Sequence, residues 1–500
     1  MAISSYDSLY AISDIHLGGE KGFQIFNQGE RLAKTINNIA STADKPTAFV
    51  LNGDIVDFLA EAPAMHLDPL GAIDKLERIM ADPSFSMVWQ ALSNLLDNEY
   101  CHLILVLGNH DVELGLPQVQ QWLKTKLARN DAARGRLQFC FDGTGFSCTV
   151  GNKRVLCVHG NEVDSWNVVD HLALIQLSRA INRGMQVPEW DANAGTRLVI
   201  GVMNEIKKKY PMVDLLKPED KAAVPTILAL GPDVEALELT AKLARITAKR
   251  AKDKIRLETG FLAAEDELGS DEAILDKPIY DELEKLLSNT QLKADRDNSL
   301  GDDLLRNAFD RFENEPYGHE SRVELHGDEL LGVADWFARY FGEESTANRL
   351  RKVLGWLLDS DPTFDIKHKD STYEELNEIV GNDIDYLLAG HTHLRRAIPR
   401  KGGYYYNSGT WIRLIRLTQN VLDNEEEFQK TFSALSKNIE VLDRHKIPGP
   451  RGNQSLVLLQ PTVVCITQDD NETTYGCLCE AKTNGELKEI KNTRYPGGSS

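Results

Sequence analysis

The sequence YAISDIHLGG, residues 10–19, ends a short apolar run in two side chains that can bind metal ions, Asp14 and His16. Four later stretches end an apolar run in the same way: LNGDIVDF at 51–58, VLGNHDVE at 106–113, LCVHGNE at 156–162 and LLAGHTH at 387–393. Functional residues are commonly placed where the strands of an open α/β sheet pass into loops. We therefore expect these five stretches to converge on one site.

The composition is that of an ordinary globular protein with an acidic balance. The 500 residues include 56 Lys and Arg against 76 Asp and Glu, which gives a formal net charge of −20. Neutralising phosphates needs basic surface, so this charge disfavours a dedicated nucleic-acid binder, although a local basic groove stays possible. No apolar run approaches the roughly 18 residues of a membrane-spanning helix. The N-terminus also lacks the basic and apolar regions of a secretory signal.

The seven cysteines are an odd number and contain no CxxC pair, which argues against a disulfide framework or a zinc cluster. Most of them lie inside apolar, strand-like runs, as buried free thiols do. A reducing cytoplasm is therefore the expected location.

Residues 1–165 alternate between strand and helix patterns. We predict strands at 8–13, 47–52, 102–107, 146–150 and 154–158, and helices at 30–41, 68–80, 86–98 and 117–130. Such alternation predicts an α/β structure in which helices pack on a sheet.

Residues 166–380 are helix-rich and strongly charged, with helical spacing at 236–259, at 274–289 and within 333–361. Strand patterns return at 384–389, 404–407, 412–417, 456–467 and 473–481. We predict a core formed by residues 1–165 and 381–500, divided by one large helical insert at 166–380.

The polar residues at the predicted strand ends form a set of nitrogen and oxygen donors: Asp14, His16, Asp54, Asn109, His110, His159, His391 and His393. Mixed histidine and carboxylate ligands suit Mn, Fe, Zn or Ni, and not calcium alone. Two divalent ions about 3.5–4 Å apart can clamp a phosphoryl group and lower the pKa of a shared water. Asp54 is the natural bridging carboxylate.

In order, the five motifs are D-x-H, G-D-x-x-D, G-N-H-D, H and G-H-x-H, and together they resemble the calcineurin-like metallophosphoesterase superfamily. The resemblance covers about residues 8–165 and 384–418 and leaves the helical insert outside. It implies an α/β fold built as a four-layer double β-sandwich flanked by helices. The insert would then act as a cap.

The resemblance also implies two divalent metal ions, of which manganese is the one we favour. One ion would be held by Asp14, His16, Asp54 and His393, and the other by Asp54, Asn109, His159 and His391. A metal-bridging hydroxide would attack phosphorus while His110 protonates the leaving oxygen. Asp111 would orient His110, and Asp57 would support a ligating histidine or the local backbone.

Departures from the superfamily pattern narrow the range of expected substrates. Phe58 and Leu107 stand where the Ser/Thr protein phosphatases have phosphate-binding arginines, so protein dephosphorylation is disfavoured. The motifs are closer to bacterial phosphodiesterases and to SbcD-like DNA exonucleases. They also resemble the UDP-2,3-diacylglucosamine hydrolases, which commonly replace the histidine that this chain retains as His110. We favour a phosphodiester or phosphomonoester of modest size.

Three residues near the motifs are candidates for substrate contact: Arg395, Arg396 and Asn161. Asp164, close behind the VHG turn, could also face substrate. A different class of function stays open, in which the helical insert is an interaction module with a protein partner. The chain would then be a regulatory or scaffold protein.

Overall fold

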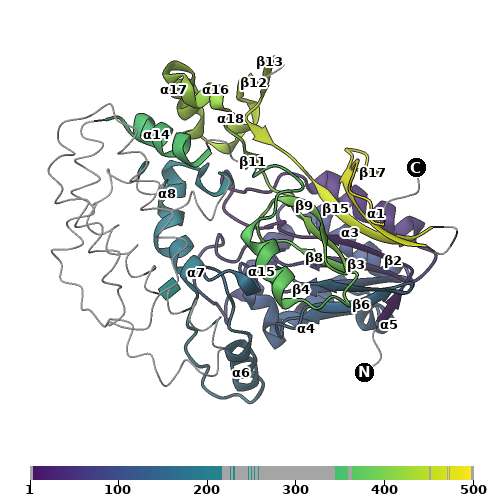
Figure 1. Cartoon of the computed structure of the whole chain (residues 1–500). Helices are drawn as coiled ribbons and strands as arrows, with labels where there is room; N and C mark the ends of the chain where they lie inside the picture. Colours follow the sequence, from purple (N-terminus) through teal and green to yellow (C-terminus); the bar gives the residue numbers. More distant parts are fainter. Residues whose placement is uncertain are drawn as a thin grey trace, which may run out of the picture. The chain divides into compact units, whose positions relative to one another are not determined.

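The structure is a computed structural model of the whole chain (Figure 1), and it describes residues 4–216, 344–358, 363–449, 452–469 and 473–496, with a few isolated positions besides. The chain divides into two compact units. The first unit comprises Met1–Ala192, Pro362–Arg413 and Leu459–Ser500, and the second comprises Asn193–Asp361 and Leu414–Leu458. All five motifs lie in the first unit.

Two β-sheets form the centre of the first unit. The six-stranded sheet has the order β1-β6-β7-β8-β10-β9, with β1 Ser4–Tyr6, β6 Phe146–Val150, β7 Lys153–Cys157, β8 Tyr386–Ala389, β9 Arg395–Arg400 and β10 Gly403–Ser408. The seven-stranded sheet has the order β17-β16-β15-β2-β3-β4-β5, with β2 Ser8–Ile12, β3 Thr47–Asn52, β4 Cys101–Val106, β5 Leu137–Cys140, β15 Thr462–Gln468, β16 Thr474–Ala481 and β17 Leu487–Glu489.

The strands that lead into the motifs run parallel to their neighbours. In the seven-stranded sheet β2 pairs with β3 and β3 with β4, so that Leu51 lies beside both Ile12 and Leu105. In the six-stranded sheet β7 pairs with β8, with Cys157 beside Leu388. Because neighbouring parallel strands end at the same edge of a sheet, the loops that follow them are brought together.

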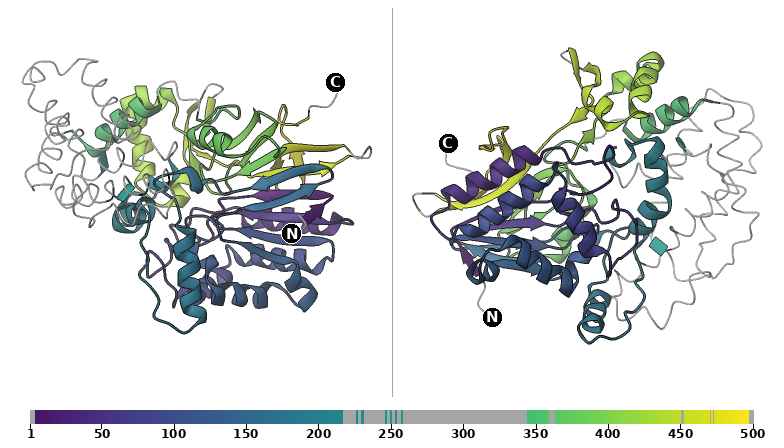
Figure 2. Two further views of the ribbon diagram at one scale, coloured as in Figure 1. Left: turned by 60° about the horizontal axis from the view of Figure 1, so that its bottom comes forward. Right: turned by 180° about the vertical axis from the view of Figure 1, so that it is seen from behind.

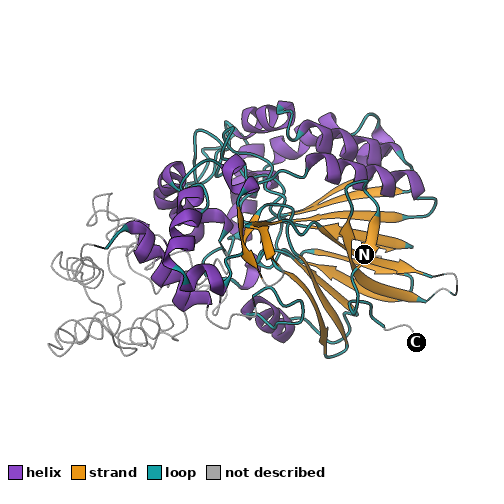
Figure 3. Cartoon of the chain, turned by 90° about the horizontal axis from the view of Figure 1, so that it is seen from above, coloured by secondary structure: helices purple, strands orange, loops and turns teal. Residues whose placement is uncertain are grey.

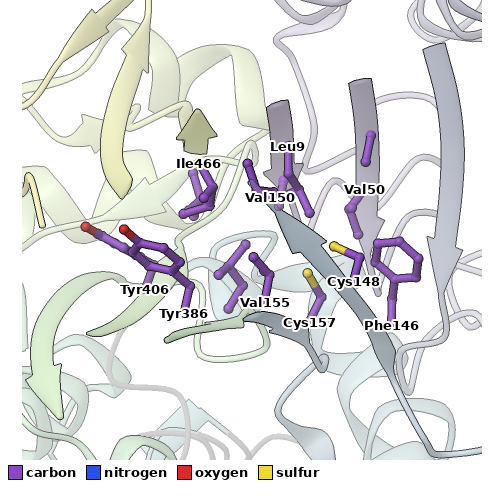
Figure 4. Packing of buried hydrophobic residues seen from close by; sticks show 14 of the residues in the cluster. Leu9, Val50, Phe146, Cys148, Val150, Val155, Cys157, Tyr386, Tyr406 and Ile466 are labelled. Atoms are coloured by element: carbon purple, nitrogen blue, oxygen red, sulfur yellow. The ribbon is translucent and has the colours of Figure 1, made fainter. Parts of the chain in front are cut away.

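The inner faces of the two sheets share one apolar core. Leu9, Val50 and Ile466 from the seven-stranded sheet pack with Val155 and Tyr386 from the six-stranded sheet (Figure 4). These side chains are fully buried. Burial of each one contributes roughly 1.5–3 kcal/mol relative to an exposed side chain, which holds the sheets face to face.

Helices cover the outer faces of both sheets. Those from the first 135 residues are α1 Gly29–Thr42, α2 Ala72–Ala81, α3 Ser86–Asp97, α4 Pro117–Leu127 and α5 Asp131–Gly135. In Figure 2, seen from behind, these purple-to-blue helices lie across the seven-stranded sheet. In α1, Leu32, Ile36 and Ile39 recur at helical spacing and are all buried, which gives the helix the apolar stripe that packs inward.

On the other side, α15 (Ser371–Ile379) covers the six-stranded sheet. Its Tyr373 and Leu376 pack against Leu387, Ile398 and Tyr405. The order of layers is therefore helix, sheet, sheet, helix, and Figure 3 shows the strands in orange beside the purple helices. The predicted α/β double sandwich flanked by helices is confirmed.

Most predicted strands are found, and β3 and β6 have the predicted bounds. The predicted strand at 456–467 is divided into β14 (Val457–Leu458) and β15, and β9 is a strand that the prediction missed. β9 is the edge strand of its sheet and contains the exposed Pro399. An edge strand tolerates proline and charged residues because one side makes no ladder hydrogen bonds, so its sequence carries a weak strand signal.

The second unit is mainly helical in its described residues. Its elements include α7 Ala194–Leu198, η3 Val199–Met203, α8 Asn204–Lys209, η4 Val213–Leu215, α14 Thr346–Leu358, α16 Gln419–Asp423, α17 Glu425–Leu435 and α18 Ile439–Arg444. Two short strand pairs accompany them: β11 (Leu414–Ile415) with β14, and β12 (Lys446–Gly449) with β13 (Gly452–Ser455). None of the helices in the described ranges is both long and apolar enough to cross a membrane.

The division into units differs from the predicted boundaries at 165 and 380. Helix α6 (His171–Asn182), which contacts α4, and helix α15 both belong to the first unit, although their charge and helical pattern placed them in the predicted insert. Conversely, Leu414–Leu458 belongs to the second unit, where α16 and α17 contact α14. The predicted helix at 274–289, and most of the one at 236–259, lie outside the described residues.

Candidate metal centre

The predicted ligands and the predicted general acid His110 follow the strand ends: Asp14 and His16 after β2, Asp54 after β3, Asn109 and His110 after β4, His159 after β7, and His391 and His393 after β8. The two sheets thus deliver these side chains from five separate strands. Six of the eight are buried, and His110 and His391 are partly exposed.

The first group with metal-ligand spacing contains four side chains: Asp14, His16, Asp54 and His393. Their ligand atoms all lie within 4.8 Å of one another. His393 Nε2 is 3.3 Å from Asp14 Oδ1 and 3.2 Å from His16 Nε2. His16 Nε2 is 3.8 Å from Asp54 Oδ2. The structure therefore brings together the four residues that the resemblance implies for the first ion.

The second group contains Asp54, His159 and His391. His159 Nε2 is 3.2 Å from Asp54 Oδ2, so Asp54 belongs to both groups. Asn109 lies next to this carboxylate, because the backbone N–H of His110 donates to Asp54 Oδ1 at 2.9 Å. The buried Oδ1 of Asn109 accepts no hydrogen bond from any residue that the structure describes.

The hydrogen bonds of His159 show which of its nitrogens is available to an ion. Its Nδ1 lies 2.8 Å from the carbonyl oxygen of Asn52, and a carbonyl can only accept, so Nδ1 carries the hydrogen. Nε2 then faces the oxygen of Asp54, and in the neutral ring it presents a lone pair there, where a metal ion could take the place of a proton. Two electron-rich atoms 3.2 Å apart in a buried site repel each other unless a cation lies near both. The donor set fits a metal ion.

The backbone of the site is strained. Five non-glycine residues of the two groups have positive φ: 53° at Asp14, 51° at His16, 51° at Asp54, 69° at His391 and 60° at His393. Side chains with a Cβ rarely adopt this left-handed conformation, which costs of the order of 1–3 kcal/mol each. The fold thus holds these ligands in an unfavourable conformation that aims them at one point.

Charges in the site compensate one another. Burial alone would raise the pKa of Asp54, but the imidazoles of His159 and His110 hold it well below its usual range. Burial opposes the charged form of His159, yet the carboxylates of Asp54 and Asp14 outweigh it and raise the pKa of His159 to about 10. The carboxylates of Asp14 and Asp54 thus favour a positive charge at His159. A divalent cation would compete with a proton for Nε2 of His159 and for the carboxylate oxygens.

Two partly exposed carboxylates, those of Glu162 and Asp164, contact the residues of the ligand loops. Glu162 accepts hydrogen bonds from the backbone N–H groups of His159, at 3.1 Å, and Gly160, at 2.6 Å. Asp164 Oδ2 lies 2.8 Å from His391 Nε2. Neither contact was predicted, although Asp164 had been considered as a substrate contact. Carboxylates beside ligating histidines fix the ring orientation, and this is the arrangement that Asp164 provides.

The loop that carries His391 is tied to the first strand. The His391 backbone N–H donates to both carboxylate oxygens of Asp14, at 3.1 and 3.0 Å. Asn407 Nδ2 donates to the carbonyl of Gly390 at 2.6 Å, and Thr410 Oγ1 donates to the carbonyl of Asp14 at 2.6 Å. The contacts to Asp14 join residues 377 and 396 positions apart, which no local pattern in the sequence could show.

The orienting partner of His110 differs from the prediction. Asp57 Oδ1 lies 3.1 Å from His110 Nδ1, whereas Asp111 accepts hydrogen bonds from the backbone N–H groups of Ile55 and Gly108, both at 2.7 Å. Asp111 is fully buried and connects two motif loops. In the structure Asp57 contacts the His110 ring, whereas Asp111 holds the backbone of two motif loops, and a role of Asp111 in orienting His110 stays a prediction.

Arg396, one of the predicted substrate contacts, is buried and bonded within the protein. Its side chain is 1% exposed, its Nε donates to Asp370 Oδ2 at 2.9 Å, and its Nη1 donates to the carbonyl of Asp365 at 3.1 Å. These bonds attach β9 to the residues before α15 and engage Nε and Nη1 of the guanidinium group. Neighbouring residues of a strand point to opposite faces, so the adjacent Arg395 faces the other side of the sheet.

The other two predicted substrate contacts are Asn161 and Arg395. Asn161 is 1% exposed, and its Nδ2 donates to the carbonyl of Asn167 at 3.0 Å. Arg395 is partly exposed, and its buried Nε lacks a hydrogen-bond partner among the residues described. Neither residue belongs to the groups with metal-ligand spacing. Substrate contact by these two side chains stays a prediction.

The family model described as "Calcineurin-like phosphoesterase" matches residues 8–200. This range contains the first four motifs, and the G-H-x-H motif at 390–393 joins them in space through His391 and His393. No curated protein matches the chain at a significant level. Metal ions and phosphoester hydrolysis are general properties of this family. The family match over residues 8–200 and the buried Asp/His groups together support the calcineurin-like metallophosphoesterase superfamily for this part of the chain.

Proposed function

We propose that this protein hydrolyses a phosphodiester or phosphomonoester of modest size at a centre of two divalent metal ions. Family membership implies phosphoester hydrolysis in general. The observation that carries the two-ion proposal is the shared carboxylate of Asp54, which lies 3.2 Å from His159 Nε2 and 3.8 Å from His16 Nε2. A carboxylate between two histidine-containing groups is suited to bridge two ions.

The proposed ligands of the first ion are Asp14, His16, Asp54 and His393, and those of the second are Asp54, Asn109, His159 and His391. When bound, the ions would neutralise charge on the phosphoryl oxygens and make hydroxide available near neutral pH. Mn²⁺ is the favoured ion, and Fe, Zn or Ni suit the same mixture of nitrogen and oxygen donors.

His110 is the proposed general acid. Its side chain is 20% exposed, whereas those of His16, His159 and His393 are at most 8% exposed, so His110 has the better access to a substrate. Asp57 lies 3.1 Å from Nδ1 and stabilises the protonated imidazole, which leaves the Nε2–H to deliver a proton. As the bond from phosphorus to the leaving oxygen breaks and water supplies the new oxygen, that proton neutralises the leaving alkoxide.

The direct test is hydrolysis of bis-p-nitrophenyl phosphate and p-nitrophenyl phosphate by protein that has been stripped of metal and reloaded with Mn²⁺. We expect turnover of at least one ester, loss of turnover after stripping, and recovery on reloading. Asp54→Asn should lose both bound metal and activity. Asp131→Asn, at a side chain that is 95% exposed, is the matched control and should retain both. Folded, metal-loaded protein that hydrolyses neither ester, nor any member of a nucleotide panel, would refute the proposal.

Labelled single- and double-stranded DNA in the same assay tests the exonuclease alternative. The net charge of −20 makes nucleic acid the less favoured substrate. Degradation of DNA at a rate well above that of the small esters would move the substrate proposal to nucleic acid while leaving the metal centre intact.

A further inference from the structure

Three thiols gather on one face of the strands β15 and β16 of the seven-stranded sheet. Cys465 on β15 lies directly opposite Cys477 on β16, and Cys479 follows two residues after Cys477. The sulfur atoms of Cys477 and Cys479 are 3.6 Å apart. All three residues are buried, with exposed fractions of 5%, 3% and 7%.

This thiol cluster, defined as Cys465, Cys477 and Cys479, faces away from the core between the sheets. The alternate residues Val464, Ile466 and Leu478 belong to that core. Successive side chains of a strand point to opposite faces, so the three cysteines point outward. They share no residue with the three groups of metal-ligand spacing found among the described residues, and none of those groups contains a cysteine.

The register of the strands decides which two cysteines can be joined. Directly opposed residues of antiparallel strands have Cα atoms about 4.5–5.5 Å apart, within the range of about 4.4–6.8 Å that a disulfide needs. Residues two apart on one strand are about 6.6–6.8 Å apart, at the limit of that range. Cys465 and Cys477 are therefore the pair whose backbone geometry accepts a disulfide.

Cys477 is the central thiol of the cluster, because it lies opposite Cys465 and its sulfur is 3.6 Å from that of Cys479. The neighbouring thiols of Cys465 and Cys479 lower the pKa of Cys477, although burial works against this. In contrast, burial raises the pKa of Cys148, which lies in the core between the sheets, to about 12. The thiolate is the reactive form of cysteine, so oxidation should begin at Cys477.

We propose that Cys465 and Cys477 are a reversible redox modification site that closes to a disulfide when a hydroperoxide oxidises the protein. The Cys477 thiolate attacks one peroxide oxygen, which breaks the O–O bond, forms a sulfenic acid and releases water or an alcohol once the leaving oxygen is protonated. The Cys465 thiol then attacks the sulfenic sulfur, the S–S bond forms, and water leaves. Two electrons pass from sulfur to the peroxide, and a dithiol such as dithiothreitol returns them.

The experiment treats the full-length protein with hydrogen peroxide, blocks remaining thiols by alkylation and identifies disulfides by mass spectrometry without reduction. Trypsin leaves all three cysteines on one fragment, because no Lys or Arg lies between 452 and 481. Cleavage at the acidic residues within 469–472 instead separates Cys465 from the other two. We expect the two fragments to remain joined, two hydrogens lighter than their sum, and to separate after dithiothreitol. Separate fragments with all three thiols alkylated after peroxide treatment would overturn the proposal.

Cysteine variants identify which thiol forms the disulfide with Cys465. Cys479→Ala should retain the joined fragments, whereas Cys477→Ala should lose them. Cys140→Ala, at a partly exposed thiol on β5, is the matched control and should behave as the unmodified protein. Joined fragments in Cys477→Ala would show that Cys465 pairs with Cys479 and would refute the register argument. Because the unmodified protein alone decides whether a disulfide forms, a variant that fails to fold does not affect that result.

Discussion

Nδ1 of His110 lies 3.1 Å from Oδ1 of Asp57, and Oδ2 of the same carboxylate lies 3.7 Å from Nδ1 of His16. One buried carboxylate thus contacts both the proposed general acid and a proposed metal ligand. The two imidazole rings meet edge to face, with centroids 4.7 Å apart. The positive charge of His110 holds the pKa of Asp57 well below its usual range despite its burial. Asp57 therefore fixes the position of His110 relative to the metal centre.

Asp57→Asn should lower kcat by about 10- to 100-fold, because an amide of the same size cannot stabilise the protonated imidazole. We expect the amount of bound metal to change little, since the proposed ligands are retained. Steady-state kinetics together with metal analysis of the purified variant provide the measurement.

The matched control for this variant is Asp111→Ala, which removes the acceptor of two buried backbone N–H groups. It should lower the free energy of unfolding by roughly 1–3 kcal/mol. If Asp57→Asn leaves kcat unchanged while Asp111→Ala lowers it at full metal content, Asp111 and not Asp57 would be the residue that orients His110.

The difference between these two aspartates shows where sequence reasoning ends. The order and spacing of the motifs identified the strand ends, and therefore the residues that meet at the centre. They did not show in which direction each side chain points. Asp111 is adjacent to His110 in the chain but turns towards backbone N–H groups, whereas Asp57, more than 50 residues earlier, contacts the imidazole. Only the packing of two loops determines this.

The arginines after the last motif show that the sequence also failed to indicate one strand of the fold and the direction of its side chains. Their charge indicated a phosphate contact, but the polar residues of an edge strand look like a loop in sequence. Once β9 pairs with β10, Arg396 must face α15, where Asp370 is its partner. The helical content of α6 and α15 was equally visible in the sequence, but not which sheet or helix each packs against.

Gly53→Ala should displace His159 and weaken metal binding. A Cβ at Gly53 would lie 2.2 Å from the Nδ1 of His159, and the φ of 87° disfavours any side chain at this position. Overpacking of this kind typically costs 1–3 kcal/mol. Calorimetric titration with Mn²⁺ and thermal unfolding would measure the two effects.

Gly184→Ala separates the effect of the clash with His159 from the effect of the positive φ. Its φ is 63°, but an added Cβ would meet no atom within 4 Å. This variant should therefore show the backbone strain alone and retain full metal affinity. Equal loss of metal affinity in both variants would show that the approach of Gly53 to His159 does not matter.

Removal of metal should lower the melting temperature. The carboxylates of Asp14 and Asp54 are buried beside one another, and the proposed ions would stabilise the folded state by binding it alone. At a free ion concentration 100 times the Kd, this contribution is about 2.7 kcal/mol. Calorimetry of stripped and Mn²⁺-loaded protein gives the shift, and a melting temperature that does not depend on ion concentration would contradict it.

Arg396→Met should destabilise the protein without changing the KM for any ester. The variant keeps an apolar side chain of similar length but leaves Asp370 and the carbonyl of Asp365 without their donor, at a cost of roughly 1–3 kcal/mol. Urea unfolding and steady-state kinetics are the measurements. A KM raised several-fold at unchanged stability would instead return Arg396 to the substrate-binding residues.

Glu113 should make the stability of the protein depend on pH between about 4.5 and 7. Its side chain is 1% exposed, and burial raises the pKa of this carboxyl from 4.5 to about 7, although Lys75 nearby partly opposes the shift. The folded pKa is above the unfolded value, so the folded protein binds the proton more tightly. The contribution of Glu113 is fully present below pH 4.5 and is lost as the pH rises through 7.

Glu113→Gln removes this titration but can still accept the hydrogen bond that the Asp68 backbone N–H donates to Oε1 at 3.1 Å. The free energy of unfolding of the unmodified protein, relative to the variant, should therefore fall between pH 5.5 and 7, with a limiting slope of about 1.4 kcal/mol per pH unit. Urea unfolding at several pH values measures the difference. Glu30→Gln, at an exposed position on α1, should leave the slope nearly unchanged. Parallel pH curves for Glu113→Gln and the unmodified protein would mean that the Glu113 carboxyl titrates alike in the folded and unfolded chain, which its burial between Asp68 and Lys75 argues against.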